Sequence, residues 1–108
     1  MNQFEVLADP VRRRIVELLA PGERTAGELT IAIGEEFGIS QPAVSNQLRI
    51  LRETGLASAQ RRGSTRLYAL QPEALDEVDA WLQRQRRFWD QRLDALGTEL
   101  SRGRKEES

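Results

Sequence analysis

The sequence predicts a mainly α-helical domain that carries one small β-hairpin. Three observations lead to this fold class. Residues 24–38 and 40–55 each combine a capping residue, apolar side chains at helical spacing and a closing glycine. Residues 56–70 contain the turn signal of a hairpin. Residues 72–96 repeat an apolar side chain every seven positions, which indicates a long amphipathic helix.

The first long helix is predicted to start at the Asp9-Pro10 pair and to end near Ala20. Asp is a favoured N-cap and Pro is tolerated in a first turn, while Pro21 and Gly22 break the helical pattern. The expected core residues of this helix are Ile15, Leu18 and Leu19.

Three consecutive arginines, Arg12–Arg14, lie near the start of this helix, where the helix dipole disfavours positive charge. They form either an exposed cluster balanced by Asp9 and Glu17 or a group in which at least one arginine contacts a phosphate. The sequence leaves both interpretations open.

The next helix is predicted within residues 24–38. Thr25 and Glu28 form a capping box, Phe37 closes an apolar pattern that recurs every fourth residue from Leu29, and Gly38 ends the helix. Only Gly38 and Ile39 separate this helix from the next N-cap, so the two helices are expected to meet at a tight turn.

The following helix is predicted from about residue 41 to residue 54. Ser40 is its N-cap, Pro42 fits its first turn and Gly55 ends it. One narrow stripe, made of Val44, Leu48 and Leu51, must face a core.

The opposite face of that helix carries Asn46, Arg49 and Glu53, flanked by Gln41, Ser45 and Arg52. An ordinary solvated face favours long Glu and Lys side chains, whereas this helix has no Lys and several short side chains that permit close approach. The pattern favours a recognition helix of a helix-turn-helix, with side chains suited to base edges and phosphates.

A hairpin is predicted next, with Gly63-Ser64 as a two-residue turn and Arg61, Arg62 and Arg66 near its tip. A hairpin that follows a recognition helix is a wing. The net charge is only −1, but residues 40–70 hold five arginines against one glutamate. The positive charge is thus concentrated where phosphate contacts need it.

The last helix is predicted from Pro72 to about Leu96. Its apolar stripe is wider than one small winged domain can cover, which implies a partner helix. An apolar ligand pocket between subunits is the alternative. The stripe consists of Leu75, Leu82, Trp89 and Leu96, flanked by Val78, Trp81, Phe88 and Leu93.

These pieces together resemble the ArsR (arsenic-repressor-like) family of winged helix-turn-helix regulators. The resemblance is carried by LADPVRRRIVELL (7–19), ISQPAVSNQLRILRETGL (39–56) and RRGSTRLYAL (61–70). It implies an α-α-α-α-β-β-α order and a homodimeric repressor. The recognition helices would enter successive major grooves of double-stranded DNA, and the first and last helices would form the dimer interface.

The resemblance implies base reading by Gln41, Ser45, Asn46 and Gln47, with backbone contacts from Arg49 and the wing arginines. The full expected DNA-binding set is Ser40, Gln41, Pro42, Ala43, Ser45, Asn46, Gln47, Arg49, Arg61, Arg62, Ser64, Thr65 and Arg66. The expected dimerisation set is Phe4, Leu7, Leu75, Val78, Trp81, Leu82, Phe88, Trp89, Leu93 and Leu96.

The chain departs from the family pattern in two respects. It has no Cys and no His, so sensing of metals by thiolate or imidazole is excluded, and the carboxylates of Asp76, Glu77 and Asp79 are expected to be solvated. Four extra residues, Glu35–Gly38, precede Ile39; they add about one helical turn, through which Phe37 would extend the core.

We therefore expect one domain, residues 1–100, followed by a disordered polar tail, residues 101–108. Without Cys or His, and with Lys105 as its sole lysine, the chain is not expected to be an enzyme or to need a cofactor. No apolar run is long enough for a membrane span, and we expect the cytoplasm. A dimeric winged-helix module that binds another protein is the rival function, and an unidentified small-molecule inducer is left open.

Overall fold

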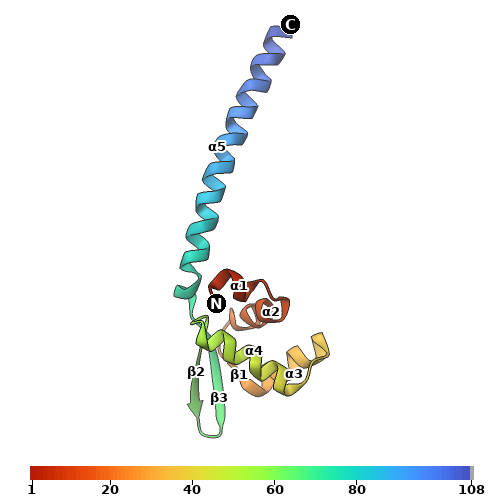
Figure 1. Cartoon of the computed structure of the whole chain (residues 1–108), viewed down its shortest axis with the longest axis vertical. Helices are drawn as coiled ribbons and strands as arrows, with labels where there is room; N and C mark the ends of the chain where they lie inside the picture. Colours follow the sequence, from red (N-terminus) through yellow and green to blue (C-terminus); the bar gives the residue numbers. More distant parts are fainter. Residues whose placement is uncertain (108) are drawn as a thin grey trace. The chain divides into compact units, whose positions relative to one another are not determined.

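The computed structural model describes the backbone of residues 1–107 and the side chains of residues 1–99. The chain forms two units, Met1–Asp76 and Glu77–Ser108. Figure 1 shows the elements in chain order: α1 (Gln3–Leu7), α2 (Pro10–Leu19), β1 (Arg24–Thr25), α3 (Ala26–Phe37), α4 (Gln41–Glu53), β2 (Ala57–Arg62), β3 (Thr65–Leu70), a 3-10 turn (Pro72–Leu75) and α5 (Asp76–Glu107).

The helices of the first unit begin at polar caps. The Asp9 carboxylate accepts hydrogen bonds from the backbone N–H groups of Val11 and Arg12, and the hydroxyls of Thr25 and Ser40 accept one from Glu28 and Ala43 respectively. Each such cap stabilises a helix by about 1 kcal/mol. The N-caps predicted from the sequence are thus confirmed. Asn2 caps the short helix α1 in the same way.

The turn between α3 and α4 depends on one glycine. Gly38 follows the last residue of α3 with φ 66°, in the left-handed region, and its N–H donates to the carbonyl of Gly34 at 2.9 Å. A side chain at this position would be strained. The chain then passes through Ile39 and Ser40 directly into α4, as the spacing predicts.

The extra turn before α4 is part of α3. Phe37 packs against the edge of the core, as expected, and Arg14 of α2 donates through Nε to both carboxylate oxygens of Glu36 at 3.1 Å. The inserted residues therefore lengthen α3 by a turn that is held against α2.

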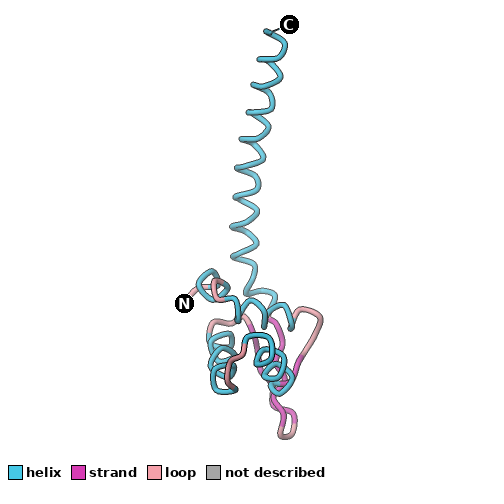
Figure 2. The backbone as a smooth tube through the Cα atoms, turned by 90° about the vertical axis from the view of Figure 1, so that its right-hand side faces the viewer, coloured by secondary structure: helices cyan, strands magenta, loops and turns pink. Residues whose placement is uncertain are grey.

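The sheet has three antiparallel strands in the order β1-β3-β2. Figure 2 shows the strands in magenta beside the helices of the first unit. Arg62 pairs with Thr65, which leaves Gly63 and Ser64 as the predicted two-residue turn, with Gly63 at φ 63°. Strand β1 is a correction, because the predicted order of elements contains only the two strands of the hairpin. Thr25 must be extended to act as the cap of α3, and this conformation lets β1 pair with β3.

A single apolar core holds the first unit together. It draws residues from α1, α2, α3, α4 and the sheet, and none of its buried side chains is polar or charged. The apolar stripe of α4 is buried as predicted. Two residues that were expected in the dimer interface, Leu7 and Leu75, are partly buried against this core. The core residues are Val6, Ile15, Leu19, Leu29, Ile33, Val44, Leu48, Leu51, Leu56, Ala57 and Tyr68.

The second unit consists of α5, and both of its predicted ends are corrected. The sequence predicts a helix from Pro72 to about Leu96, whereas α5 begins after the 3-10 turn and runs to Glu107. A single glycine such as Gly97 costs only about 1 kcal/mol within a helix, and the Glu, Arg and Lys residues that follow are good helix formers. Helix α5 thus continues past the predicted end as far as Glu107, and Ser108 lies outside the described residues. The disorder expected of the polar tail stays a prediction.

Candidate nucleic-acid interface

The orientation of α4 follows from its buried side. Val44, Leu48 and Leu51 are at most 2% exposed, so they fix which side of the helix reaches the solvent. Gln41, Ser45, Asn46 and Arg49 are all exposed. Four of the side chains predicted to contact DNA therefore lie on the free side of a helix whose other side is anchored in the core.

Arg49 is held in place along the exposed face of α4. Its guanidinium donates to the Asn46 side-chain oxygen at 2.6 Å and to the Glu53 carboxylate at 3.0 and 3.1 Å. Both partners lie one helical turn away, where side chains of a helix meet. Since the Arg49 side chain is still 50% exposed, it is oriented by its neighbours and remains accessible to a ligand.

A groove of about 540 Å³ lies between α3, α4 and strand β3 of the wing. It brings three predicted DNA-binding residues of α4, namely Gln41, Ser45 and Arg49, together with Arg66 of the wing. The sequence analysis missed the contribution of α3, because only the tertiary packing places α3 beside the wing. The groove is lined by Ala26, Gly27, Thr30, Ile31, Gln41, Ser45, Leu48, Arg49, Arg52, Arg66 and Tyr68.

Gln47 differs from the other residues predicted to read bases. It is half-buried and does not line the groove. Its side-chain oxygen accepts a hydrogen bond of 3.0 Å from Arg12 of α2. The structure thus directs Gln47 toward the interior of the first unit, whereas Gln41 and Ser45 lie at the groove.

The three consecutive arginines of α2 all bind groups of the protein itself. Arg12 donates to α1 and to Gln47, and Arg13 donates to the carbonyl of Leu7 at 3.0 Å. Arg14 binds Glu17 and Glu36; the hydrogen bond to Glu17, followed by the charge of Glu36, raises the pKa of Arg14. These contacts favour a structural role over contact with a phosphate.

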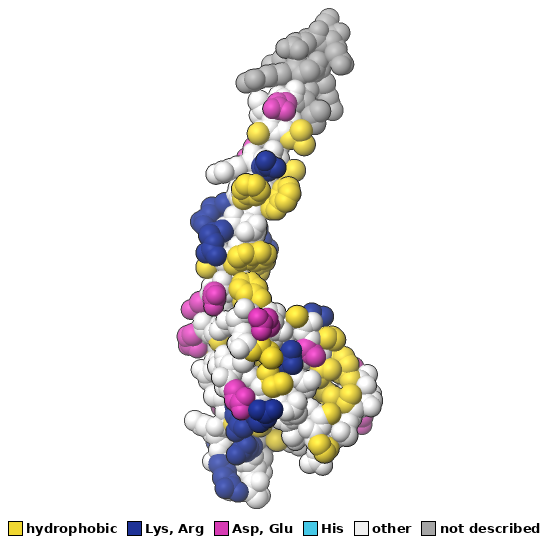
Figure 3. Space-filling model, in the orientation of Figure 1, with side chains coloured by type: hydrophobic (Ala, Val, Ile, Leu, Met, Phe, Trp, Pro, Cys, Tyr) yellow, Lys and Arg dark blue, Asp and Glu magenta, His cyan; other side chains and the backbone are white. Residues whose placement is uncertain are grey.

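The wing carries positive charge without compensation. Arg61 and Arg66 face each other across the two strands, and Arg61, Arg62 and Arg66 are all exposed. Figure 3 shows the dark blue side chains gathered on the hairpin. Among residues 1–99 no carboxylate forms an ion pair with these arginines. Like charges placed opposite each other weaken a hairpin, so this arrangement suits a polyanion.

Helix α5 displays a row of large apolar side chains. Phe88, Trp89, Leu93 and Leu96 are 51%, 55%, 60% and 52% exposed, and Figure 3 shows the yellow stripe that they form. Phe88 meets Trp89 edge to face at 5.8 Å, and Arg92 lies 5.1 Å above the Phe88 ring. An exposed apolar patch of this kind marks an interaction site.

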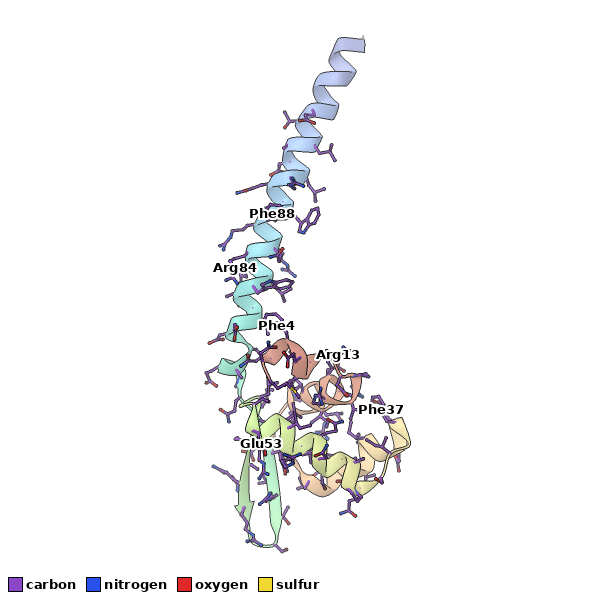
Figure 4. All side chains as sticks on the ribbon, viewed as in Figure 1. Phe4, Arg13, Phe37, Glu53, Arg84 and Phe88 are labelled. Atoms are coloured by element: carbon purple, nitrogen blue, oxygen red, sulfur yellow. The ribbon has the colours of Figure 1, made fainter. Side chains whose placement is uncertain are left out.

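A shallow hollow of about 430 Å³ lies along the same stripe. All of its lining residues belong to α5, from Trp89 to Glu99, so one helix provides its entire wall. Figure 4 shows Phe88 and Arg84 projecting from this helix. The hollow therefore fits a face that packs against another helix better than it fits a closed ligand pocket.

The described residues show neither a metal-binding cluster nor a membrane-spanning helix. Side chains of residues 1–99 contain no group of three or more His, Cys, Asp or Glu placed to hold a metal ion. No helix in the described part of the chain combines the length and the apolar character that a membrane crossing needs.

Comparison with known proteins places this geometry in a family. The family model described as "Bacterial regulatory protein, arsR family" matches residues 9–59. The transcriptional repressor SdpR of Bacillus subtilis (strain 168) is 37% identical over 81 residues, covering 75% of this chain and 86% of that protein.

Two solved structures are similar over most of the chain. The ArsR family transcriptional regulator RHA00566 has a TM-score of 0.68 at 30% identity, covering 81% of this chain and 91% of its own. The winged helix-turn-helix DNA-binding domain of Mb0332 from Mycobacterium bovis, described as homodimeric, has a TM-score of 0.59 at 30% identity, covering 74% and 70%. The chain is therefore a winged helix-turn-helix protein and belongs to the ArsR family of DNA-binding transcriptional regulators, which are not enzymes.

Proposed function

We propose that this protein is a transcriptional repressor that binds an inverted-repeat operator as a homodimer and does not respond to metals. The observation that carries the proposal is the groove beside α4, where the exposed polar face of that helix meets an uncompensated arginine of the wing. The relative SdpR is described as a transcriptional repressor, which supports the direction of regulation. Such a regulator acts on the chromosome, in the cytoplasm.

In this proposal the exposed face of α4 enters the major groove. Gln41, Ser45 and Asn46 offer short donors and acceptors to base edges, while Arg49, fixed by Asn46 and Glu53, reaches a guanine or a phosphate. The first turn of α4, from Ser40 to Ala43, approaches the DNA backbone. The wing residues complete the set through backbone contacts: Arg61, Arg62, Ser64, Thr65 and Arg66.

The proposed dimer is built mainly on α5. Its exposed stripe requires a partner, and a second copy of the same helix offers a surface of the same chemistry. The homodimeric winged domain of Mb0332 supports this assignment. The exposed large apolar side chains of α5 available for such a contact are Trp81, Leu82, Phe88, Trp89, Leu93 and Leu96. Val78 belongs to the same helix, and Phe4 and Leu7 of α1 remain candidates.

The proposal is tested by selecting DNA fragments with the purified protein and then measuring gel shifts at moderate salt. We expect an enriched inverted repeat whose half-sites lie about 10 to 10.5 base pairs apart, or a multiple of that spacing. A protein that retains no fragment above background, but forms a stable complex with another protein through α4 and the wing, would be an interaction module instead.

The wing arginines are expected to supply affinity with little choice of sequence. Arg61→Ala or Arg66→Ala should weaken binding to all duplexes to a similar extent, because these side chains contact phosphates. Each lost phosphate contact should reduce the slope of log K against log salt concentration by about one unit. Titration of an operator duplex and a scrambled duplex at several salt concentrations measures both effects.

Arg13→Ala serves as the control for this experiment, because it removes one positive charge whose hydrogen bonds are made to the protein backbone. The salt slope of this variant should stay close to that of the wild type. A wing variant that changes the preferred bases and keeps the full salt slope would make the wing a base reader.

Binding to the operator is expected to be independent of transition metals. The chain offers no thiolate or imidazole to zinc or cadmium, and carboxylates alone hold these ions weakly. Micromolar zinc should leave the operator affinity unchanged within error in gel shifts. Release of the DNA by zinc, with recovery after a chelator is added, would contradict this part of the proposal.

A further inference from the structure

We infer that Arg12 is a positioning residue that couples α1 to the recognition helix α4 through Gln47. The inference rests on the proposed function, in which α4 reads DNA. It assigns a mechanical role to an arginine outside the DNA interface. It also replaces base reading by Gln47 with a role in fixing the rotation of α4.

The guanidinium of Arg12 connects three helices. Arg12 lies in the first turn of α2, and its Nε donates to the carbonyl of Val6 in α1 at 2.8 Å. One terminal nitrogen donates to the carbonyl of Glu5, also in α1, at 3.4 Å, and the other donates to Gln47 of α4 at 3.0 Å. A single planar group thus links α4 to α1.

The contacts on the α1 side are firmly placed. The carbonyls of Glu5 and Val6 accept only long hydrogen bonds, of 3.3 and 3.4 Å, from the backbone N–H groups of Ala8 and Asp9. A carbonyl oxygen has two lone pairs, so each can also accept a charged donor. The side chain of Val6 is fully buried in the core, which anchors α1 beneath these carbonyls. Asp9, the N-cap of α2, lies 4.0 Å from Arg12 and adds an opposite charge.

The contact on the α4 side holds Gln47, a residue next to the groove-lining part of α4. Gln47 directly precedes Leu48, which is buried in the core and also borders the groove. Holding the Gln47 side chain restrains rotation of α4 about its axis, and that rotation sets where Gln41 and Ser45 point in the groove. Misplacement of recognition side chains weakens specific contacts, while phosphate contacts tolerate it better.

Arg12 is poorly placed to act as a phosphate contact. Its side chain is only 12% exposed, and its Nε and both terminal nitrogens already donate to groups of the protein. Lysine cannot replace such a fork, because it presents a compact charge and cannot span three separate acceptors in a fixed plane.

A double-mutant cycle tests the coupling. Arg12→Met, Gln47→Met and the double variant are compared on the operator duplex enriched by selection and on the same duplex with scrambled sequence. Arg12→Lys keeps the positive charge but removes the planar guanidinium with its several donors. Arg13→Met is the matched control, since it removes a neighbouring charge that bonds only to the backbone around Leu7 and Ala8.

We expect each single variant to lose about tenfold in operator affinity, because DNA binding must then restore an orientation of α4 that a charged hydrogen bond of about 1.5 kcal/mol no longer holds. The double variant should lose little more, because the two side chains share one interaction. Arg12→Met and Gln47→Met should bind the scrambled duplex about as tightly as the control Arg13→Met does. The dependence of their DNA affinity on salt concentration should also match that of the control. Arg12→Lys should behave like Arg12→Met.

Several outcomes would overturn the inference. Additive losses would show that the two residues act separately, and rescue by lysine with a reduced salt slope would make Arg12 a phosphate contact. A changed base preference in Gln47→Met would restore Gln47 as a base reader. Equal losses on both duplexes, together with a lowered melting temperature, would indicate a general loss of folding.

Two provisions keep the test decisive. If the Arg12 variants melt too low to be assayed, the base preference of Gln47→Met decides alone, because the half-buried Gln47 tolerates methionine better than Arg12 does. If the wild-type protein does not distinguish the operator from the scrambled duplex, the proposed function has failed. The same double-mutant cycle, measured on the free energy of unfolding, then still shows whether Arg12 and Gln47 interact.

Discussion

Trp89→Ala is expected to convert the proposed dimer to monomers at micromolar concentration. Trp89 is 55% exposed in the single chain and lies in the middle of the apolar stripe of α5. Replacing a buried aromatic side chain by alanine commonly costs about 3 to 5 kcal/mol. In a two-fold symmetric interface the same loss occurs in both protomers. Sedimentation velocity over a concentration series measures the resulting shift in the monomer–dimer equilibrium.

Operator binding by Trp89→Ala should fall together with the dimer, because each half-site contact is weak on its own. Gln91→Ala is the matched control: Gln91 is an exposed neutral residue two positions along the same helix and outside the stripe. This control should leave both dimerisation and DNA binding unchanged. A Trp89→Ala protein that stays dimeric yet fails to bind DNA would exclude packing between protomers as the role of Trp89.

Ile33→Ala is expected to destabilise the first unit by about 2 to 5 kcal/mol. The side chain of Ile33 is fully buried in the single core of that unit. Native domains are stable by only about 5 to 15 kcal/mol, so this loss removes a large share of the total. Urea unfolding followed by circular dichroism should show a clearly lower midpoint, and DNA binding should be lost at temperatures that the wild type tolerates.

The chain provides a close control for this substitution. Ile31 lies two residues away on the same helix, but its side chain is 63% exposed. Ile31→Ala should change the unfolding free energy by no more than about 0.5 kcal/mol. Because Ile31 lines the groove, this comparison is made on unfolding alone. If the two variants lost similar amounts of unfolding free energy, α3 would not bury the face that carries Ile33.

The local signals in the sequence were sufficient to locate helices α2, α3 and α4 and the hairpin, whereas α1 was expected only from the resemblance to a family. Asp9, Thr25 and Ser40 are caps whose hydrogen bonds involve residues two or three positions away, so the information lies within a few residues. The turn at Gly63-Ser64 is local in the same sense. The spacing of Val44, Leu48 and Leu51 indicated the buried side of α4 for the same reason.

Features that depend on distant residues could not be predicted. Strand β1 forms because residue 24 meets Tyr68 of β3, and the groove exists because α3 packs beside the wing. The link between Arg12 and Gln47 joins residues 35 positions apart. The resemblance to a family placed Gln47 among the base readers, and only the tertiary structure revealed its contact with Arg12. The sequence analysis ended the last helix at about Leu96, where the seven-residue apolar repeat stops, whereas α5 continues to Glu107.

The central claim is that two copies of this chain read one inverted repeat through α4. Changing the spacing of the two half-sites tests this claim most directly. The enriched operator is compared with the same duplex carrying five extra base pairs between its half-sites, which moves one half-site to the opposite face of the DNA. We predict that this insertion lowers the affinity to that of a single half-site, because the dimer can no longer engage both. Equal affinity for the original duplex, the lengthened duplex and a single half-site would contradict the account.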